Sequence, residues 1–200
     1  MFIVLEGLDG SGKSTQARLL SQRLTAAHIS NICTRQPTDS PIGKMARAFT
    51  QGEFDNLQNE TIGLLFAADR FQHFTQEIAP ALLQGQFVIC DRYYYSNMAY
   101  QGVDDAALGR IVSYNQAVRA AKIPDITLFL DVKPKECIRR IATARDEMSI
   151  YDTLPRLVHL RERYLAAFDQ LKVSDNIAII TTHGLSEAEV CDKIWQKLFP

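Results

Sequence analysis

Several features of metal-binding, secreted and membrane proteins are missing from this sequence. The four cysteines form no C-x-x-C pair, and the four histidines lie far apart with no H-E-x-x-H pattern. We therefore expect free thiols in a reducing compartment, and we do not expect a zinc site built by the protein alone. No apolar run approaches the ~20 residues that span a bilayer. Because the chain begins directly with a strand-like run, we expect no signal peptide and a cytoplasmic protein.

Neither sign of charge dominates. The chain has 22 Lys and Arg against 23 Asp and Glu, which gives a net charge of −1. Such a balance gives no general attraction to nucleic acid or to a membrane, so any anion binding must be local. The length of 200 residues, with 46% hydrophobic residues, suits a single globular domain with a sizeable core.

The stretch from Gly7 to Ser14 reads GLDGSGKS, follows an apolar run at 2–5 and precedes an amphipathic helix pattern. It fits G-x-x-x-x-G-K-[ST], the phosphate-binding loop. The glycines let successive N–H groups face one anion, Lys13 adds a positive charge, and the Ser14 hydroxyl can hold Mg²⁺. The positive end of the following helix also faces the phosphates. The residues expected to bind the nucleoside triphosphate are Gly7, Asp9, Gly10, Ser11, Gly12, Lys13, Ser14 and Thr15.

Strand patterns alternate with helix patterns along the chain. We expect strands at 2–5, 29–35, 87–90, 126–130 and 177–180, and helices at 13–28, 41–51, 57–83, 106–121, 134–144, 153–172 and after Ser186. The stretch 93–102 is an aromatic-rich loop or helix start. This alternation predicts an α/β protein with the three-layer P-loop NTPase fold, in which a five-stranded parallel sheet has helices on both faces.

Charged residues stand where the predicted strands end. Parallel sheets bind ligands at the carboxyl ends of their strands, so the loop at 7–14, Arg35 and Asp91-Arg92 should converge. Asp91 is a candidate Mg²⁺ ligand with Ser14, and Asp131 is the competing candidate because it also ends an apolar strand. Arg35 and Arg92 are suited to receive a second phosphate, since a guanidinium matches a phosphate in two hydrogen bonds.

Two further groups of residues admit alternative interpretations. Phe66 and Arg70 are four residues apart on one helix face. Either the two side chains bind a planar base together, or Phe66 belongs to the core and Arg70 forms a surface ion pair. Six arginines flank an irregular stretch, which we interpret as a lid at about 143–152. They are Arg139, Arg140, Arg145, Arg156, Arg161 and Arg163. Arg145 lies in the lid itself and is the expected catalytic arginine, whereas Arg156 and Arg163 suit a solvated helix face.

Together these motifs resemble one family, the thymidylate kinases among the P-loop nucleoside monophosphate kinases. The matching pieces are FIVLEGLDGSGKST at 2–15, TRQP at 34–37, LLFAADR at 64–70 and CDRYYYSNMAYQG at 90–102. The resemblance implies ATP with Mg²⁺, the acceptor dTMP and a homodimer that forms by helix packing. It also implies that Lys13, Arg92 and Arg145 are catalytic and that Ser14 and Asp91 serve the metal.

The resemblance assigns dTMP to nine positions, which are Asp9, Arg35, Phe66, Arg70, Arg92, Ser96, Tyr100, Gln101 and Tyr151. Asp9 should contact the sugar 3′-hydroxyl, Arg35 and Arg92 the phosphate, and Tyr151 the deoxyribose. Phe66 should stack on thymine while Arg70 bonds its edge, and Ser96, Tyr100 and Gln101 should line the base pocket.

Two positions depart from the family pattern. Gln36 replaces the acid of the usual T-R-E-P, which could alter the Mg²⁺-water network near the acceptor. Ile150 stands in the lid where an arginine is common. The phosphate loop itself has Gly10 and no arginine, a pattern that in this family goes with a catalytic arginine from the lid and so favours Arg145.

The expected reaction is phosphoryl transfer from ATP to dTMP. A kinase for another pyrimidine nucleoside monophosphate is the closest alternative. A deoxynucleoside kinase would need a carboxylate base, and two arginines for an acceptor phosphate disfavour it. A catalytically weak nucleotide-binding homologue is the remaining alternative. The chain has neither a D-x-x-G at a strand end nor N-K-x-D, so a GTPase switch is not expected.

Overall fold

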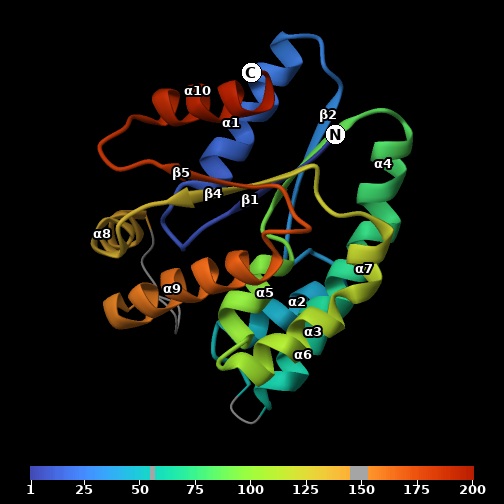
Figure 1. Ribbon diagram of the computed structural model, residues 1–200, viewed down its shortest axis with the longest axis vertical. Coiled ribbons are helices and arrows are strands. Elements are labelled where there is room, and N and C mark those ends of the chain that lie inside the picture. Colours follow the sequence, from blue (N-terminus) through green and yellow to red (C-terminus); the bar gives the residue numbers. More distant parts are fainter. Residues whose placement is uncertain (55–56, 145–152) are drawn as a thin grey trace.

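A five-stranded parallel sheet forms the centre of the protein in the computed structural model, which describes residues 1–54, 57–144 and 153–200 (Figure 1). Its order is β2-β3-β1-β4-β5, and every neighbouring pair is parallel. The strands are β1 (Phe2–Glu6), β2 (Asn31–Arg35), β3 (Phe87–Asp91), β4 (Ile126–Asp131) and β5 (Ile177–Thr181). The predicted fold class is therefore confirmed, and all five strands lie where the sequence patterns placed them.

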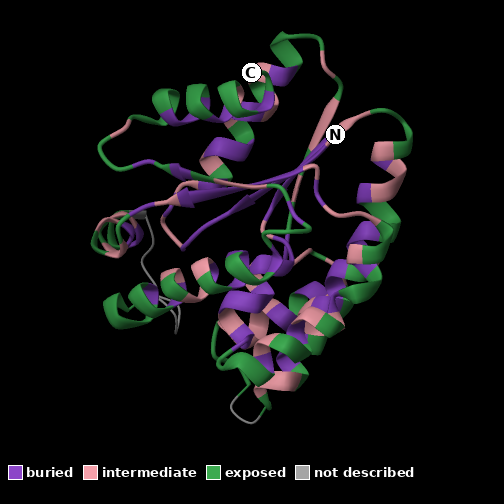
Figure 2. Cartoon of the chain, viewed as in Figure 1, coloured by how far each residue is buried: buried purple, intermediate pink, exposed green. Residues whose placement is uncertain are grey.

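Two helical layers enclose this sheet. The helices α1 (Lys13–Ala26) and α10 (Glu187–Leu198) cover one face, and α5 (Tyr94–Gln101) and α9 (Leu154–Leu171) lie on the other (Figure 1). Successive side chains of a strand point to opposite faces, so Phe2 and Val4 join one core while Ile3 and Leu5 join the other. Figure 2 accordingly shows the central strands buried between the layers.

The helix predicted over 57–83 consists of three segments. They are α3 (Asn59–His73), a π-helical turn η1 (Phe74–Ile78) and α4 (Ala79–Leu83). Pro80 has no N–H, and its ring would clash with the carbonyl four residues earlier in a regular α-helix. A π turn immediately before proline relieves this conflict, which explains why the pattern is continuous while the helix is not.

The helix predicted over 106–121 is also divided, into α6 (Asp105–Tyr114) and α7 (Gln116–Ala121). The break is at Asn115, whose buried side chain donates to the carbonyl of Ile111 at 2.8 Å. Such local side-chain bonds compete with helical ones. The helices α2 (Pro41–Thr50) and α8 (Pro134–Ala144) match their predictions, and Ser186 with Glu189 forms the capping box of α10.

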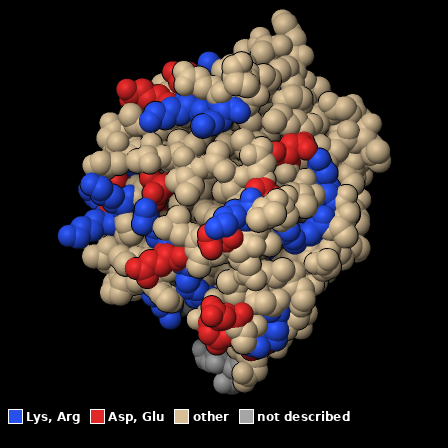
Figure 3. Space-filling view, in the orientation of Figure 1, with Lys and Arg blue, Asp and Glu red and all other residues tan. Residues whose placement is uncertain are grey.

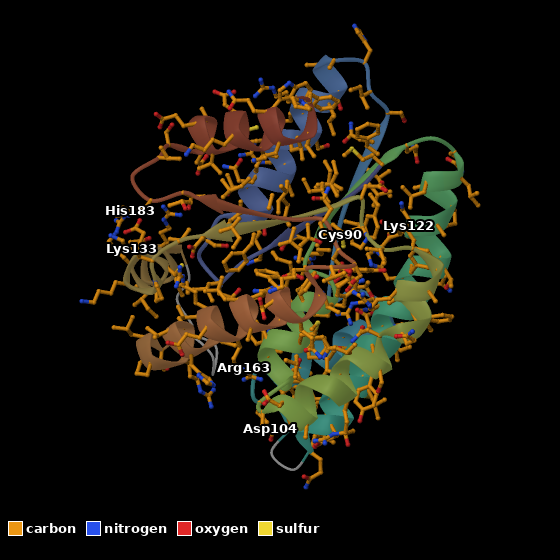
Figure 4. All side chains as sticks on the ribbon, viewed as in Figure 1. Cys90, Asp104, Lys122, Lys133, Arg163 and His183 are labelled. Atoms are coloured by element: carbon orange, nitrogen blue, oxygen red, sulfur yellow. The ribbon has the colours of Figure 1, made fainter. Side chains whose placement is uncertain are left out.

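Lys and Arg are interspersed with Asp and Glu over the face seen in Figure 3, as the balanced composition predicted. Cys90 lies near the middle of the sheet (Figure 4), where burial raises the pKa of its thiol well above the ordinary value. All four cysteines are free. Among the described residues, no helix combines the length and the apolar character that crossing a bilayer requires.

Asp175 ties α5 and α7 to the segment before β5. Its carboxylate accepts from both the Tyr94 and Tyr95 hydroxyls and forms two bonds with Arg119, at 2.9 and 3.0 Å. Burial would raise the pKa of Asp175, but the bonds from Arg119 and the hydroxyls outweigh it and hold the pKa below its ordinary value. Because the folded pKa is lower than the unfolded one, this contribution to stability is present at neutral pH and is lost on acidification.

Asp175→Asn should lower the free energy of unfolding by about 3 kcal/mol at pH 7, because it removes the buried carboxylate and leaves the partly buried Arg119 guanidinium without its counter-ion. The difference in unfolding free energy between Asp175→Asn and the wild type should shrink as the pH falls below about 4, where the carboxyl of Asp175 begins to protonate in the unfolded chain. Urea unfolding of both proteins across this pH range measures the effect. A difference independent of pH would contradict the assigned ion pair.

Candidate active site

The carboxyl ends of β1, β2 and β3 meet at one edge of the sheet. Asp91 pairs in register with Leu5 on one side and with Arg35 on the other. The phosphate loop follows β1 directly, so it begins beside Asp91 and Arg92. The structure thus brings together the three segments that the strand ends predicted to converge.

The phosphate loop has a backbone that its glycines permit. Gly10 has φ +75°, and a Cβ there would lie 2.6 Å from the carbonyl oxygen of Cys137 on α8. Any side chain at this position, arginine included, would force α8 to move. Gly12, with φ +94°, is the residue from which α1 starts at Lys13. The unpaired N–H groups of this helix start therefore face the same side as the loop.

Lys13 lies inside the loop and is only 6% exposed. Its ammonium donates to the carbonyl of Leu8 at 2.8 Å. Burial, with the neighbouring Arg92, lowers the pKa of Lys13, while Asp91 and Asp9 act in the opposite direction. A buried ammonium that donates to a backbone carbonyl is well placed to exchange that partner for a phosphate oxygen.

Ser14 and Asp91 are in direct contact, since the Ser14 hydroxyl donates to Asp91 Oδ2 at 2.6 Å. The other carboxylate oxygen, Oδ1, is buried and has no hydrogen-bond partner among the described residues. The competing Asp131 is instead engaged by Arg161 in two bonds, at 2.7 and 2.8 Å. A hydroxyl beside an unpartnered carboxylate oxygen is a hard-oxygen set that fits Mg²⁺, so the geometry favours Asp91 over Asp131.

A cleft of about 600 Å³ lies between the loop, α8 and the segment from β5 to α10. Seven of the eight predicted triphosphate-binding residues line it, from Asp9 to Thr15, while Gly7 lies behind them. Arg139 and Arg140 also line it, and both bond Glu136. These arginines lower the pKa of Glu136 to about 2. The cleft is therefore bordered by cations held in place by one carboxylate.

Arg92 occupies the centre of the site with a left-handed backbone, at φ +70°. One end of its guanidinium, Nη2, donates to Asp9 Oδ1 at 2.7 Å. The other end, Nη1, donates to Ser96 Oγ at 3.0 Å and to the Tyr164 hydroxyl at 3.3 Å. Tyr100 presents its ring to the guanidinium and its hydroxyl to Asp9. Ser96 and Tyr100, assigned to the base pocket, thus lie against Arg92.

Arg70 is 2% exposed and is surrounded by neutral acceptors. Its Nε donates to Gln36, its Nη1 to Asn97 and Asn115, and its Nη2 to the carbonyl of Tyr93. A guanidinium has five N–H groups, so these four bonds leave one N–H on Nη2 for another partner. The surface ion pair with Asp69 or Glu77, which was one sequence interpretation of Arg70, is wrong.

Gln36 connects Arg70 to His73. It is buried, and its side chain joins Arg70, at 2.9 Å, to His73 Nδ1, also at 2.9 Å. Burial lowers the pKa of His73, which keeps its ring neutral so that Nδ1 can accept from the amide. Gln36 therefore supports the guanidinium of Arg70. The side chain of Gln101 joins the same network by accepting from Asn97 at 3.1 Å.

Arg35 borders a second cleft, of about 670 Å³, that also includes Asp91, His73 and Thr38. Its side chain is 63% exposed and lies 3.5 Å from Asp39. Ser14 lines both clefts. Among the described residues assigned to dTMP, Arg35 is the one that lines this second cleft. Phe66, on α3, is half-buried. Arg145, Tyr151 and most of the predicted lid lie outside the described residues.

Several residues of the site were not predicted from the sequence. They are Glu6, Asn97, Asn115 and Tyr164, all buried and all bonded to Arg70, Arg92 or their neighbours. Two of them carried a signal. Glu6 is an acid that ends an otherwise apolar buried strand, and Asn115 interrupts a helical pattern where asparagine is unfavourable. Tyr164 lies on the helix that the sequence predicted over 153–172.

Comparison with known proteins gives a consistent result. The profile of the family described as Thymidylate kinase matches residues 5–194. A "Probable thymidylate kinase" of Methanococcus aeolicus is 37% identical over 199 residues, covering 98% of this chain and 95% of the relative. A "Thymidylate kinase" of Leptospira borgpetersenii is 37% identical over 200 residues, covering 100% and 95%. One from Pyrococcus horikoshii, described as probable, is 40% identical over 169 residues, covering 82% and 80%.

The match extends over nearly the whole chain and includes the phosphate loop, the strand ends, the helix that carries Arg70 and the segment after β3 that carries Arg92. The five-stranded parallel sheet and the cleft around the phosphate loop agree with this similarity. The chain belongs to the thymidylate kinase family and is a nucleotide-binding phosphotransferase that uses ATP.

Proposed function

We propose that this enzyme transfers the γ-phosphoryl group of ATP to the phosphate of dTMP, giving ADP and dTDP, and that the residues assembled at the sheet edge carry out the transfer. The observation that supports this most strongly is that Arg92, which suits an acceptor phosphate, lies beside the phosphate loop and donates to Asp9 of that loop at 2.7 Å. Lys13, within the same loop, is the buried cation for the donor phosphates. A kinase that joins two nucleotides needs cations for the phosphates of both, whereas a binding module needs them for only one.

On the donor side, the N–H groups of the phosphate loop and Lys13 would bind the β- and γ-phosphates of ATP. Ser14 and Asp91 would hold Mg²⁺, because their oxygens are adjacent and Asp91 Oδ1 is buried without a partner among the described residues. When bound, this ion would neutralise charge on the phosphate oxygens. Arg139 and Arg140 add positive charge at the border of the cleft.

On the acceptor side, Arg92 and Arg35 would hold the phosphate of dTMP. A phosphate monoester is largely dianionic near neutral pH, so its oxygen attacks without a general base. The protein's task is then to orient the two nucleotides and to neutralise charge on the transferring group, which Lys13 and Arg92 would do together. Arg145 remains the proposed third cation, supplied by the lid.

Recognition of the base would come from α3 and α5, which carry the residues assigned to it. Phe66 would stack on thymine, and the remaining Nη2 hydrogen of Arg70 would bond an oxygen on the base edge. Gln101, Tyr100 and Ser96 would border the base, with Asp9 and Tyr151 near the deoxyribose. Because four N–H groups of Arg70 are held by the protein, its guanidinium is preorganised for this bond.

The acceptor specificity is tested by measuring ADP formation from ATP and Mg²⁺ with dTMP, dUMP, dCMP, UMP or thymidine. We expect turnover with dTMP to exceed that with the other acceptors. Turnover with thymidine but not dTMP would overturn the proposal in favour of a deoxynucleoside kinase. Tight ATP binding without turnover of any acceptor would instead support a binding homologue.

Asp91→Asn should raise the Mg²⁺ concentration for half-maximal activity about tenfold, because it replaces a charged ligand oxygen with a neutral amide. Asp131→Asn is the matched control, since Asp131 ends β4, which lies on the other side of β1 from β3, and is bonded to Arg161. Titration of activity against Mg²⁺ measures both. If Asp131→Asn caused the larger shift, the metal would have been assigned to the wrong strand end.

We further propose a homodimer that forms through α2 and α3. Met45, Leu64 and Phe71 are 51%, 50% and 46% exposed. Leu64 and Phe71 are two turns apart and lie on the same face of α3, next to α2. Such a patch favours a second copy of the chain as its partner. We place the enzyme in the cytoplasm, where nucleotides are available and free thiols persist.

A further inference from the structure

We propose that Glu6 is a positioning residue for Arg92, and that it acts through the hydroxyls of Ser96 and Tyr164. Glu6 is the last residue of β1, directly before the phosphate loop, and it is completely buried. Its hydrogen bonds go to Tyr93, Ser96 and Tyr164 and not to Arg92 itself, so it must act on Arg92 through these residues. The inference rests on the proposed role of Arg92 in phosphoryl transfer.

The two oxygens of Glu6 accept four bonds. Oε2 accepts from Ser96 Oγ at 2.7 Å and from the Tyr164 hydroxyl at 3.0 Å. Oε1 accepts from the backbone N–H groups of Tyr93 and Ser96, at 2.8 and 3.1 Å. A carboxylate accepts on both oxygens and donates on neither, so it suits this set of donors.

The hydroxyls of Ser96 and Tyr164, between Glu6 and Arg92, accept hydrogen bonds from Arg92 and donate away from it. The guanidinium of Arg92 only donates, and it bonds both Ser96 Oγ and the Tyr164 hydroxyl. A carboxylate only accepts. The two hydroxyls lie 2.8 Å apart, so one can donate to the other, but the chain of donors still runs from Arg92 to Glu6. Glu6 thus keeps lone pairs of both hydroxyls turned toward Arg92 Nη1.

Glu6 also supports the backbone on which Arg92 stands. Arg92 has φ +70°, a conformation that is strained for a residue with a side chain. Glu6 Oε1 accepts bonds from the backbone N–H groups of Tyr93, the residue after Arg92, and of Ser96, in the first turn of α5. Tyr93 is the N-cap of this helix, and its own side chain makes no capping bond. The same carboxylate therefore fixes both the backbone turn and one end of the guanidinium.

This arrangement links the donor half of the site to the acceptor half. The phosphate loop begins at Gly7, one residue after Glu6, while Ser96 lies on α5 and Tyr164 on α9. Asp9, within the loop, holds the other end of the guanidinium at 2.7 Å. Arg92 is therefore held from both sides by residues of the β1-loop segment, which sets its position relative to the ATP phosphates.

The first test uses the ligand-free protein, so it does not depend on catalysis. We would record ¹⁵N spectra of the arginine side chains and assign Arg92 by its loss in Arg92→Lys. In the wild type we expect separate Nη signals, because both ends of the guanidinium are held. Tyr164→Phe and Glu6→Gln should merge these signals, whereas Tyr95→Phe should not. Tyr95 is the matched control, since its buried hydroxyl donates to a different carboxylate, that of Asp175.

The second test is a double-mutant cycle on kcat. Tyr164→Phe should lower kcat about 5-fold and Glu6→Gln about 50-fold, with the KM for ATP nearly unchanged. In an Arg92→Lys background both losses should fall below 2-fold, because the residue through which they act is gone. Should Glu6→Gln fail to fold, Tyr164→Phe and Ser96→Ala carry the test.

Unchanged Arg92 signals in the variants, or equal losses of kcat in both backgrounds, would overturn the positioning role. Merged Arg92 signals in a protein that does not phosphorylate dTMP would have a different meaning. Glu6 would still position Arg92, and only the proposed function would fail.

Discussion

Lys13→Ala should lower kcat by about 10³-fold while the protein stays folded. Lys13 is the buried cation of the phosphate loop, and among the described residues its ammonium donates to the carbonyl of Leu8. Removing it takes away charge that opposes the developing charge on the transferring phosphoryl group. The effect on stability should stay within about 1 kcal/mol, because the loss of one backbone bond is offset by the relief of a buried charge.

The measurement is kcat at saturating ATP and dTMP, together with thermal unfolding of the free protein. Lys172→Ala is the matched control, since Lys172 is exposed and pairs with Asp169 at the end of α9. The control should keep wild-type kcat. If Lys13→Ala retained more than about a tenth of wild-type kcat, the phosphate loop would not have the role proposed for it.

Arg70→Ala should have the second large effect, and it should alter both stability and acceptor binding. Four acceptors, on Gln36, Asn97, Asn115 and Tyr93, would lose their donor in the interior. Each buried acceptor left unsatisfied costs about 1–3 kcal/mol, and these costs are not additive. We expect the free energy of unfolding to fall by about 3 kcal/mol, which lowers Tm by roughly 6–12 °C for a chain of this size.

The KM for dTMP should rise by about 10- to 100-fold, the equivalent of one lost charge-assisted bond, with the KM for ATP changed less than about 3-fold. Phe66→Ala separates the two effects, because Phe66 takes no part in the hydrogen-bonded network around Arg70. It should raise the KM for dTMP with a smaller loss of stability. An unchanged KM for dTMP in Arg70→Ala would show that Arg70 is purely structural.

The parts of the fold and site that depend on local pattern were predictable from the sequence. Apolar runs fixed the five strands, the spacing of Gly7, Gly12 and Lys13 identified the phosphate loop, and the strand ends indicated that Arg35 and Asp91 would meet. These inferences use periodicity and the geometry of parallel sheets, which hold whatever the rest of the chain does.

The hydrogen-bond partners of buried polar groups could not be predicted in this way. Arg70 bonds Asn115, which is 45 residues away, and Glu6 bonds Tyr164, which is 158 residues away. Which polar residues meet in a core depends on the packing of whole helices. For the same reason Gln36 was associated with the metal, whereas its amide lies against Arg70 and His73.

The division of two predicted helices has a simpler physical cause. Pro80 and Asn115 each stood within an otherwise regular apolar pattern, and each disturbs the backbone hydrogen bonds where it occurs. The periodicity of side chains continued across both positions, because the segments on either side pack against the same core. Pattern alone therefore placed the helices correctly and missed their interruptions.

The central claim is that two nucleotides meet in this site and exchange a phosphoryl group. ³¹P NMR of the enzyme with ATP, Mg²⁺ and dTMP follows every phosphorus atom and tests the claim most directly. We predict that the γ-phosphate signal of ATP is lost in equal measure to the appearance of the β-phosphate of dTDP, with no inorganic phosphate. Release of inorganic phosphate in place of dTDP would show that the site hydrolyses ATP and would contradict the account.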